Sequence, residues 1–240
     1  MTTLKEILTL ITSRYRGALY FKVREELRKQ LKQKPKNIQV LDVGGRNSPY
    51  TCCMPGQYTI SDLKRESSSQ MQLKLGFTDN IIENLKHNRS NLKDVVFDDM
   101  TKTKFMSNSF DGVIAIEVIE HIVEDEVFIW NIYSVLKPGG FLILTTPNGY
   151  AIPKSNPDHV RHYHIDDLKS KLSKVFDWVV VDYAVPMTRA HAKSLSPWSI
   201  KRPCKTIRTM INSYINFLQQ KVYVLNKSNS VHLLAVARKN

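Results

Sequence analysis

The sequence of 240 residues holds only three cysteines, Cys52, Cys53 and Cys204. Their spacing matches neither a metal-ligand motif nor a disulfide framework, and we interpret them as free thiols in a reducing cytosol. No apolar run reaches the roughly 18 residues that a transmembrane helix needs, so no membrane span is expected. The short apolar groups of residues 1–36 are broken by charges and do not fit a secretory signal. The length predicts one domain, and the expected location is cytoplasmic.

Acidic residues are absent from one long segment, because Tyr183 to Asn240 contains ten Lys and Arg residues and no Asp or Glu. Most of the formal net charge of +13 lies at this end, where residues 150–240 hold fifteen basic and five acidic residues. Residues 1–35 hold nine basic and three acidic residues, and residues 36–149 hold eleven and fourteen. Such a basic region is either a solvated face or a site for an anionic partner: a phosphorylated substrate, nucleic acid or an anionic membrane.

Glycine is sparse, and its most informative occurrence is the segment Val40-Leu41-Asp42-Val43-Gly44-Gly45, which lacks the full G-x-G-x-x-G spacing. The segment predicts a buried strand that stops at a turn where the backbone closely approaches another group. In open α/β sheets ligands bind beyond the carboxyl ends of the strands, so a second strand ending at Asp62 would place a carboxylate beside this turn. That carboxylate can accept hydrogen bonds from two ribose hydroxyls. Taken alone, the segment also fits an ordinary glycine turn.

Strands and helices are expected to alternate along the chain. An N-terminal helical extension is predicted over residues 1–36, and a domain over 37–240 with a basic helical insertion at about 186–220. The other expected elements are a helix starting at Pro49, a loop at 63–75, a helix at 79–88, strands at 94–97 and 112–116, a helix ending at 135, a strand at 141–145, a helix at 166–172, a strand at 178–183, a loop at 186–203, a helix at 204–218 and a strand at 231–237. This alternation predicts an α/β fold with a doubly wound, mostly parallel sheet of about seven strands.

Five motifs in order resemble those of the class I S-adenosylmethionine-dependent methyltransferases, of the small-molecule and surface-glycan type. They are residues 40–45, Asp62, residues 105–111 with 117–122, residues 136–140, and residues 145–148. The likeness extends from about residue 38 to 183 and includes the last strand. It implies a Rossmann-like methyltransferase fold and an enzyme that uses S-adenosylmethionine and releases S-adenosylhomocysteine. An NAD-binding Rossmann domain is the structural alternative, but it would not usually carry the later motifs.

The resemblance also implies a set of cofactor-binding residues: Asp42, Gly44, Gly45, Asp62, Leu63, Asp98, Asp99, Met100 and Glu117. By that likeness Gly44 lines the methionine end of the cofactor and Asp62 holds the ribose hydroxyls. Asp99 faces the adenine amino group, with Asp98 as the near alternative. Glu117 lies at a strand end on the sulfur side. For either aspartate a turn cap is the alternative role.

Histidines are the candidates for a general base. A sulfonium already makes the methyl carbon electrophilic, so the protein mainly aligns the reactants in a dry site. A hydroxyl acceptor with a high pKa gains from a positioned base, and histidine suits neutral pH. His162 is predicted first, with His159 and His164 beside it, because this stretch is expected to overhang the cleft. The further candidates are His121, for which capping or packing is the favoured role, and His191; no metal site is expected.

The leading functional hypothesis is an O-methyltransferase acting on a small molecule, such as a sugar, nucleotide-linked sugar or glycan intermediate that carries phosphate. An RNA methyltransferase that uses the basic C-terminal third is the first alternative. Against it, no aromatic-interleaved RNA-binding motif is present, and residues 146–149 do not match the signature of amino-group methylation. The second alternative is an inactive cofactor-binding module that holds a partner. A third, helix 204–220 resting on an anionic membrane, is disfavoured by its mostly uncharged polar face.

Overall fold

A seven-stranded sheet forms the centre of the molecule, with the strand order β3-β2-β1-β4-β5-β7-β6. The structure is a computed structural model that describes residues 3–32, 34–66, 76–151, 158–196, 198–199 and 201–240. All neighbouring strands pair in parallel except β7, which runs antiparallel to both β5 and β6. The strands are β1 (Gln39–Val43), β2 (Gln57–Asp62), β3 (Leu92–Phe97), β4 (Phe110–Ile116), β5 (Leu136–Pro147), β6 (Trp178–Pro186) and β7 (Ser230–Arg238). The predicted fold class, a doubly wound and mostly parallel sheet, is confirmed.

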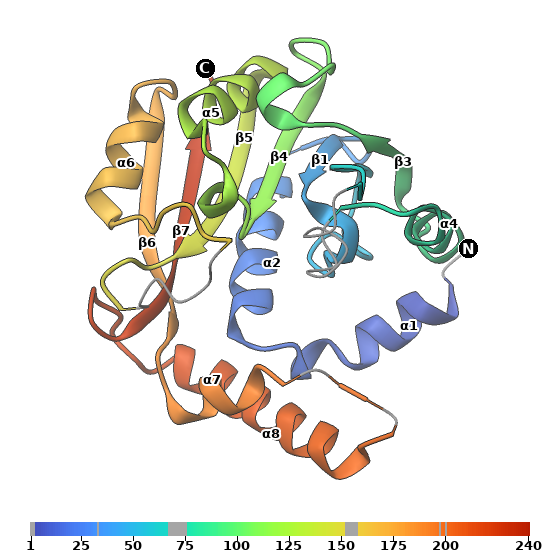
Figure 1. The fold of residues 1–240 in the computed structure, drawn as a ribbon, viewed down its shortest axis with the longest axis vertical. Helices are drawn as coiled ribbons and strands as arrows, with labels where there is room; N and C mark the ends of the chain where they lie inside the picture. The colour runs from blue at the N-terminus through green and yellow to red at the C-terminus, as the bar shows by residue number, and fades with distance from the viewer. Residues whose placement is uncertain (1–2, 33, 67–75, 152–157, 197, 200) are drawn as a thin grey trace.

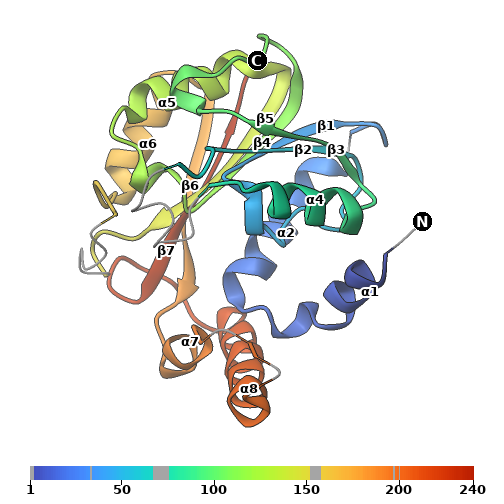
Figure 2. The same cartoon turned by 45° about the vertical axis from the view of Figure 1, so that its right-hand side comes forward.

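Helices cover both faces of this sheet (Figures 1 and 2). On one face α5 and α6 pack their buried apolar residues against β1, β4 and β5. On the other face α2 packs Leu27 and Leu31 against Val40 and Phe141, and α4 packs against β2 and β3. The helices are α1 (Leu4–Ile11), α2 (Ala18–Leu31), α4 (Asp79–Asn88), α5 (Asp125–Val135), α6 (Ile165–Ser173), α7 (Arg189–Ser194) and α8 (Pro203–Gln220), with 3-10 turns η1 (Ser13–Tyr15), η2 (Gly45–Asn47), η3 (Met100–Lys102) and η4 (Ile119–His121).

The central strands β1 and β4 consist mostly of buried residues, which fits their position in the middle of the sheet. Four successive residues of β4, from Gly112 to Ala115, are buried, as a strand covered by helices on both faces requires. In β1 the buried run continues through Asp42, a polar residue that the sheet carries at its carboxyl end. The carboxyl ends of β1, β2 and β4 lie side by side because these strands pair in parallel, and they define the edge at which a ligand can bind.

Two expected elements differ from the structure. No α-helix follows β1; the chain makes only η2 and then a series of turns through Pro49 to β2. The segment between η2 and β2 is too short and too broken for a helix, because Pro55 and Gly56, with φ +111°, force turns before β2. The expected loop at 186–203 contains α7, which Thr188 caps by accepting a hydrogen bond from the His191 backbone N–H. Most of the expected 63–75 loop lies outside the described residues.

The helices at residues 4–34, 79–88, 166–172 and 204–218 are all confirmed within a few residues at each end. The N-terminal helices do not lie apart from the sheet, since Val23 and Leu27 of α2 are fully buried in its core clusters. No helix among the described residues is long and apolar enough to cross a lipid bilayer.

Candidate functional site

A cavity of about 370 Å³ opens beyond the carboxyl ends of β1, β2, β3 and β4. This volume lies within the range of about 300–1,000 Å³ that small-molecule and cofactor sites have. Except for Gly45, every residue predicted to bind the cofactor lines it: Asp42, Gly44, Asp62, Leu63, Asp98, Asp99, Met100 and Glu117. The parallel strands therefore gather at one edge the residues that the motifs place far apart in the sequence.

The glycine pair after β1 shapes the floor of this cavity. Gly44 has φ +69°, a left-handed conformation that favours glycine, and a Cβ atom there would lie 2.8 Å from Val118 Cγ2. A Cβ atom on Gly45 would lie 2.7 Å from Asp42 Cγ, so Gly45 allows that carboxylate to pack behind the turn. Asp42 is 1% exposed, and burial is the main cause that raises the pKa of its carboxyl group. Thr51 Oγ1 donates a 2.7 Å hydrogen bond to Asp42 Oδ2.

Three aspartates follow β2 and β3 and offer acceptors to a ligand. Asp62 Oδ2 lies 2.7 Å from Arg46 Nη1, and Asp62 Oδ1 accepts the Leu63 backbone N–H at 2.8 Å. Because each carboxylate oxygen has two lone pairs, both can still accept a further hydrogen bond. Asp99 Oδ1 caps η3 by accepting from the Thr101 backbone N–H and hydroxyl, whereas Asp98 Oδ2 is buried and has no hydrogen-bond partner among the described residues. The free oxygen of Asp98 makes it the better-placed acceptor for an amino group, and the turn-cap role falls to Asp99.

Glu117 is held in a strained backbone conformation at the end of β4. Its φ is +55°, which is uncommon for a residue with a side chain and is typical of functional sites. Thr145 Oγ1 donates to Glu117 Oε1 at 2.8 Å, and His232 Nδ1 lies 3.1 Å from Glu117 Oε2. Burial opposes the charge, but His232, Thr145 and His159 together outweigh burial and lower the pKa of Glu117. Glu117 is therefore an ionised partner for His232. His232 belongs to β7, which pairs with β5 and places this histidine opposite Pro147.

His191 and Asn216 continue this polar layer away from the cavity. The rings of His191 and His232 have centroids 6.2 Å apart. Burial, and then the neighbouring His232, lower the pKa of His191 to about 4, so its ring is neutral at pH 7. Asn216 of α8 is fully buried and donates to the Pro186 backbone oxygen at 3.2 Å. The polar groups thus run from the cavity to the inner face of α8.

The predicted catalytic histidines lie near the cavity but do not line it; His121 is the histidine among its lining residues. His159 Nδ1 and His162 Nε2 are 2.8 Å apart, and His164 packs on Tyr150 with ring centroids 4.0 Å apart. The catalytic role of His162, His159 and His164 stays a prediction.

Glu120 lies beneath these histidines. It is 1% exposed, and burial, with the nearby Glu117, raises the pKa of its carboxyl group to about 9. Glu120 is therefore protonated at neutral pH while Glu117 is ionised, a separation of pKa values that is typical of functional sites. Glu120, His121 and His159 each bring one ligand atom within 4.8 Å of the others, so they are the residues here that could hold a metal ion. His121 Nδ1 lies 3.0 Å from the Asp158 backbone oxygen, which leaves Nε2 available.

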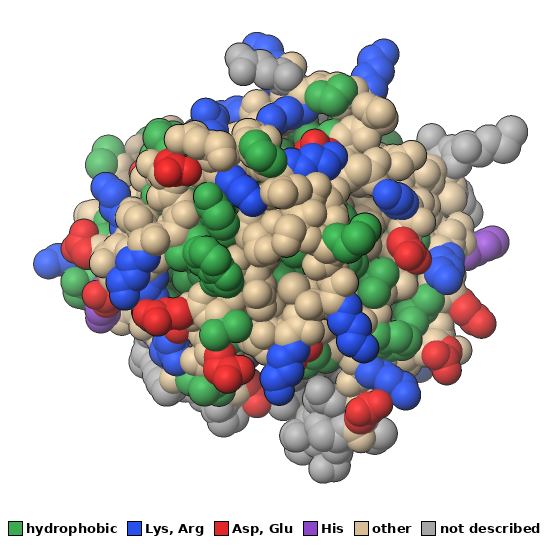
Figure 3. All heavy atoms as spheres, turned by 90° about the horizontal axis from the view of Figure 1, so that it is seen from above, with side chains coloured by type: hydrophobic (Ala, Val, Ile, Leu, Met, Phe, Trp, Pro, Cys, Tyr) green, Lys and Arg blue, Asp and Glu red, His purple; other side chains and the backbone are tan. Residues whose placement is uncertain are grey.

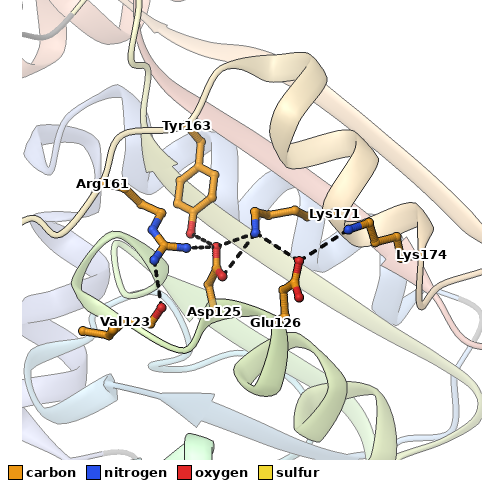
Figure 4. A network of polar contacts seen from close by, with 7 residues as sticks. All are labelled: Val123, Asp125, Glu126, Arg161, Tyr163, Lys171 and Lys174. Atoms are coloured by element: carbon orange, nitrogen blue, oxygen red, sulfur yellow. Dashed lines mark hydrogen bonds and ion pairs between the residues drawn. The ribbon is translucent and has the colours of Figure 1, made fainter.

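The loop that carries these histidines is anchored by Asp125 at the start of α5 (Figure 4). Tyr163 Oη donates to Asp125 Oδ2 at 2.7 Å, Arg161 forms an ion pair with the same carboxylate, and Lys171 lies 3.2 Å from it. Arg161 also donates to the Val123 backbone oxygen at 2.8 Å. The Asp125 side chain is 5% exposed, so this network joins α5, the histidine loop and α6 in a protected environment.

We expect Asp125→Asn to lower the free energy of unfolding by about 3 kcal/mol at pH 7, because it leaves two cations without their buried partner. Hydrogen bonds from Tyr163, Arg161 and Lys171 outweigh burial and lower the pKa of Asp125 from 3.8. Its contribution is therefore complete above that value and is lost as the pH falls through the lower, folded-state pKa. Urea unfolding should show the difference between wild type and variant shrinking below about pH 4.

The matched control is Glu126→Gln, which removes an exposed carboxylate that pairs with Lys171 and Lys174. An exposed pair of this kind contributes little, so this variant should unfold like the wild type. An Asp125→Asn protein as stable as the wild type at pH 7 would contradict the anchoring role.

A second cavity, of about 180 Å³, adjoins the first. Pro49 and Tyr50 line both cavities, and Arg24 fixes this turn by donating from Nη1 to the backbone oxygens of Tyr50 and Cys52 at 3.0 and 2.6 Å. Burial, with Glu117 and Asp42, raises the pKa of the Tyr50 hydroxyl, which therefore remains a hydrogen-bond donor. The other lining residues come from η1 and the residue after it, α2, α7, the segment after α7, and α8: Tyr15, Arg16, Tyr20, Ser194, Trp198 and Ser213.

Comparison with known proteins shows which family the strands around the first cavity resemble. Residues 41–144, from β1 to β5, match the family model described as a methyltransferase domain. Over these residues the chain has the sequence pattern of a methyltransferase domain. The predicted family is thereby confirmed, together with its cofactor, S-adenosylmethionine.

Solved structures show the same fold around this methyltransferase domain. A SAM-dependent methyltransferase from Archaeoglobus fulgidus superposes with a TM-score of 0.59 at 16% identity, covering 96% of this chain and 98% of that one. Phosphoethanolamine N-methyltransferase 2 of Haemonchus contortus, in complex with phosphomonomethylethanolamine and S-adenosylhomocysteine, gives a TM-score of 0.57 at 16% identity, covering 90% of this chain and 52% of that one. At such identities the likeness establishes the fold.

Curated relatives match over short segments. The mitochondrial ubiquinone biosynthesis O-methyltransferase of Mus musculus is 56% identical over 39 residues, which are 16% of this chain and 10% of that protein. The sterol 24-C-methyltransferase of Saccharomyces cerevisiae is 35% identical over 92 residues, 38% of this chain and 24% of that enzyme. The matches therefore span about a tenth to a quarter of the curated relatives' lengths.

The residues of the methyltransferase domain fit the cofactor on their own chemistry. The cradle at Gly44 would be filled by any side chain, and the unpartnered Asp98 oxygen is a buried acceptor that a ligand amino group can satisfy. Asp62, the predicted acceptor for the ribose hydroxyls, lines the same cavity. Sequence reasoning did not single out His232, although a histidine in an otherwise apolar last strand was a visible signal.

Proposed function

We propose that the methyltransferase domain transfers a methyl group from S-adenosylmethionine to a hydroxyl group of a small-molecule acceptor. The observation that carries this proposal is the Glu117–His232 pair, with Nδ1 to Oε2 at 3.1 Å, in which Glu117 lines the cofactor cavity and His232 lies behind it. A carboxylate that holds one ring nitrogen of a histidine leaves the other free to accept a proton. A hydroxyl of high pKa needs such a base, so the pair favours an oxygen acceptor.

In this mechanism the chain aligns the acceptor and receives its proton. Bound S-adenosylmethionine supplies a methyl carbon that the sulfonium has already made electrophilic. The acceptor oxygen would take the methyl group as the cofactor leaves as S-adenosylhomocysteine, and His232 Nε2 would receive the proton that the acceptor hydroxyl gives up. Glu117 stabilises the resulting imidazolium. Tyr50, protonated and shared by both cavities, orients the acceptor oxygen by donating a hydrogen bond.

The second cavity supports an acceptor that combines a ring with negative charge. Arg16 Cζ lies 5.8 Å from the ring centroids of both Tyr20 and Trp198, so a cation and two aromatic faces meet there. Aromatic faces suit a sugar or aryl ring, and the guanidinium suits a phosphate or carboxylate. A sugar or nucleotide-linked sugar with a free hydroxyl fits this description. The names of the relatives include O-, C- and N-methyltransferases, so they do not choose the acceptor atom.

The test is methyl transfer from labelled S-adenosylmethionine to a panel of sugar nucleotides, sugar phosphates, phenols, primary amines and RNA. Label should appear on a hydroxyl-bearing small molecule and be lost when the acceptor hydroxyl is replaced by hydrogen. Asp62→Ala serves as the cofactor-deficient control. Label on amines or RNA alone would overturn the oxygen acceptor, and cofactor binding with no transfer to any acceptor would favour an inactive module.

A further inference from the structure

Helix α8 presents its apolar residues to solvent and its polar residues to the protein. Ile207 and Ile211 are 57% and 53% exposed, and Tyr214, Ile215 and Leu218 continue the same stripe at helical spacing. The buried residues of the helix are Thr209, Ser213 and Asn216, each at most 3% exposed. This is the reverse of the usual surface helix, which turns its apolar stripe toward the core. The inward polar face is explained by Asn216 and by Ser213, which lines the second cavity.

Helix α1 has the same reversed arrangement. It buries Glu6 and Thr9, and Glu6 is held by the Thr3 and Ser90 backbone N–H groups, each at 2.8 Å. Its exposed residues are apolar: Ile7, Leu8, Leu10 and Ile11. Figures 1 and 2 place α8 at the lower end of the molecule and α1 to its right, higher in the view. Both helices expose apolar side chains that nothing in the described structure covers.

Basic side chains flank the stripe of α8. Arg202, Lys205 and Arg208 at its start are exposed, and none of them forms an ion pair with a described carboxylate. The chain from Tyr183 onward has no acidic residue. The opposite, upper face differs, because acidic and basic side chains are interspersed there (Figure 3). The lower end thus combines exposed isoleucines with unpaired positive charge.

This combination selects one kind of partner. Nucleic acid is bound mainly through phosphate contacts by basic and polar groups and gives no reason for a stripe of exposed isoleucines. A second copy of the chain would bring two basic surfaces together, which like-charge repulsion opposes. An anionic membrane accepts both features, because apolar side chains enter the acyl boundary while Lys and Arg meet the headgroups.

We propose that α8 docks the protein on the surface of an anionic phospholipid membrane. Ile207, Ile211 and Leu218 enter the interface, and Arg202, Lys205 and Arg208 contact the lipid phosphates. Docking does not require a membrane-spanning segment, and it uses the uncharged face of α8 for contacts within the protein. Of the uncharged polar residues that argued against a membrane role, Thr209, Ser213 and Asn216 are buried against the protein and leave the isoleucines on the exposed side.

The test is flotation of the full chain with phosphatidylcholine vesicles, with and without about a quarter phosphatidylserine. The wild type should float with the anionic vesicles and be released by high salt. Combining Ile207→Asn with Ile211→Asn should lower the bound fraction about tenfold, since both side chains lose their apolar contact. Combining Lys205→Gln with Arg208→Gln should reduce binding to anionic vesicles by a similar factor.

Matched controls lie on other elements. Val123 and Val127 are 68% and 43% exposed at α5, and replacing both with asparagine should leave flotation unchanged. Replacing Lys104 and Lys169 with glutamine repeats the charge change elsewhere. Each variant must also bind S-adenosylhomocysteine like the wild type, which shows that it is folded. No flotation of the wild type, or equal loss in the control variants, would overturn the proposal. A dimer that the isoleucine variant dissociates, without vesicle binding, would assign this face to a second copy instead.

Discussion

Replacing His232 with glutamine is expected to lower the rate constant of methyl transfer by about a thousandfold, within the range for loss of a general base. A glutamine amide can still donate a hydrogen bond to Glu117 but cannot take a proton from the acceptor at neutral pH. Affinity for S-adenosylhomocysteine should change little, because His232 does not line the cofactor cavity. The measurement is kcat with the acceptor found in the panel, together with calorimetric titration of the product.

The control for His232 is His87→Gln on α4, an exposed histidine on an element without contact to the pair. It should keep full activity. Glu117→Gln should lower kcat in the same way as His232→Gln, and the double variant should lose little more, since the two groups act as a unit. Full activity in the His232 variant would contradict the proposed base, and would return attention to His159 and His162.

Replacing Gly44 with alanine is expected to lower the kcat/KM of methyl transfer by about a hundredfold, because a displacement of about 1 Å in an active site has effects of this size. Two causes combine at this position: φ is +69°, and the new Cβ atom would lie 2.8 Å from Val118 Cγ2. The loop must shift, and the cofactor loses its close approach to the backbone. Steady-state kinetics and S-adenosylhomocysteine titration check this result.

Gly17→Ala separates the two causes at Gly44. Gly17 has φ +89°, but no atom lies within 4 Å of the position its Cβ would take. This control should therefore lose some stability through backbone strain while keeping its cofactor affinity. Equal kinetics in Gly44→Ala and the wild type would show that the turn after β1 does not approach the cofactor.

The grouping of the predicted cofactor residues around one cavity was predictable from the sequence, because these residues stand at strand ends in a fixed order. Gly44, Asp62 and Asp98 each lie at or directly after the end of a strand whose parallel pairing brings them to one edge of the sheet, and their role in binding the cofactor stays a prediction. The order of Asp98 and Asp99 was harder to predict, because a one-residue step decides which carboxylate caps η3. The motif does not predict which of the two aspartates caps the turn.

The acceptor half was not predictable in the same way. His232 reaches Glu117 only because β7 inserts antiparallel between β5 and β6 and sets His232 opposite Pro147. No sequence spacing encodes a contact between residues so far apart. The cluster at His159, His162 and His164 drew attention because it is local in the sequence. None of the three lines the cofactor cavity, although His159 packs against His121, which does.

Helix α8 shows a third limit. Its periodicity correctly predicted a helix at 204–218, but periodicity does not say which face turns inward. The buried partners of Asn216, the Pro186 backbone oxygen and Thr188 Oγ1, come from β6 and the residue that caps α7. Those partners make the polar face the inner one, and they leave the isoleucine stripe outside.

The most direct test of the whole account is calorimetric titration of S-adenosylhomocysteine into the wild type, Asp62→Ala and Asp94→Ala. Asp62 offers two acceptors in the cavity, and losing hydrogen bonds to a charged group should lower affinity about a hundredfold. Asp94, an exposed residue of β3 outside the cavity, should make no difference. Tight binding by the wild type and Asp94→Ala with a large loss in Asp62→Ala is the predicted result. No binding by folded wild type, or equal binding by all three proteins, would contradict the assignment of this cavity to S-adenosylmethionine.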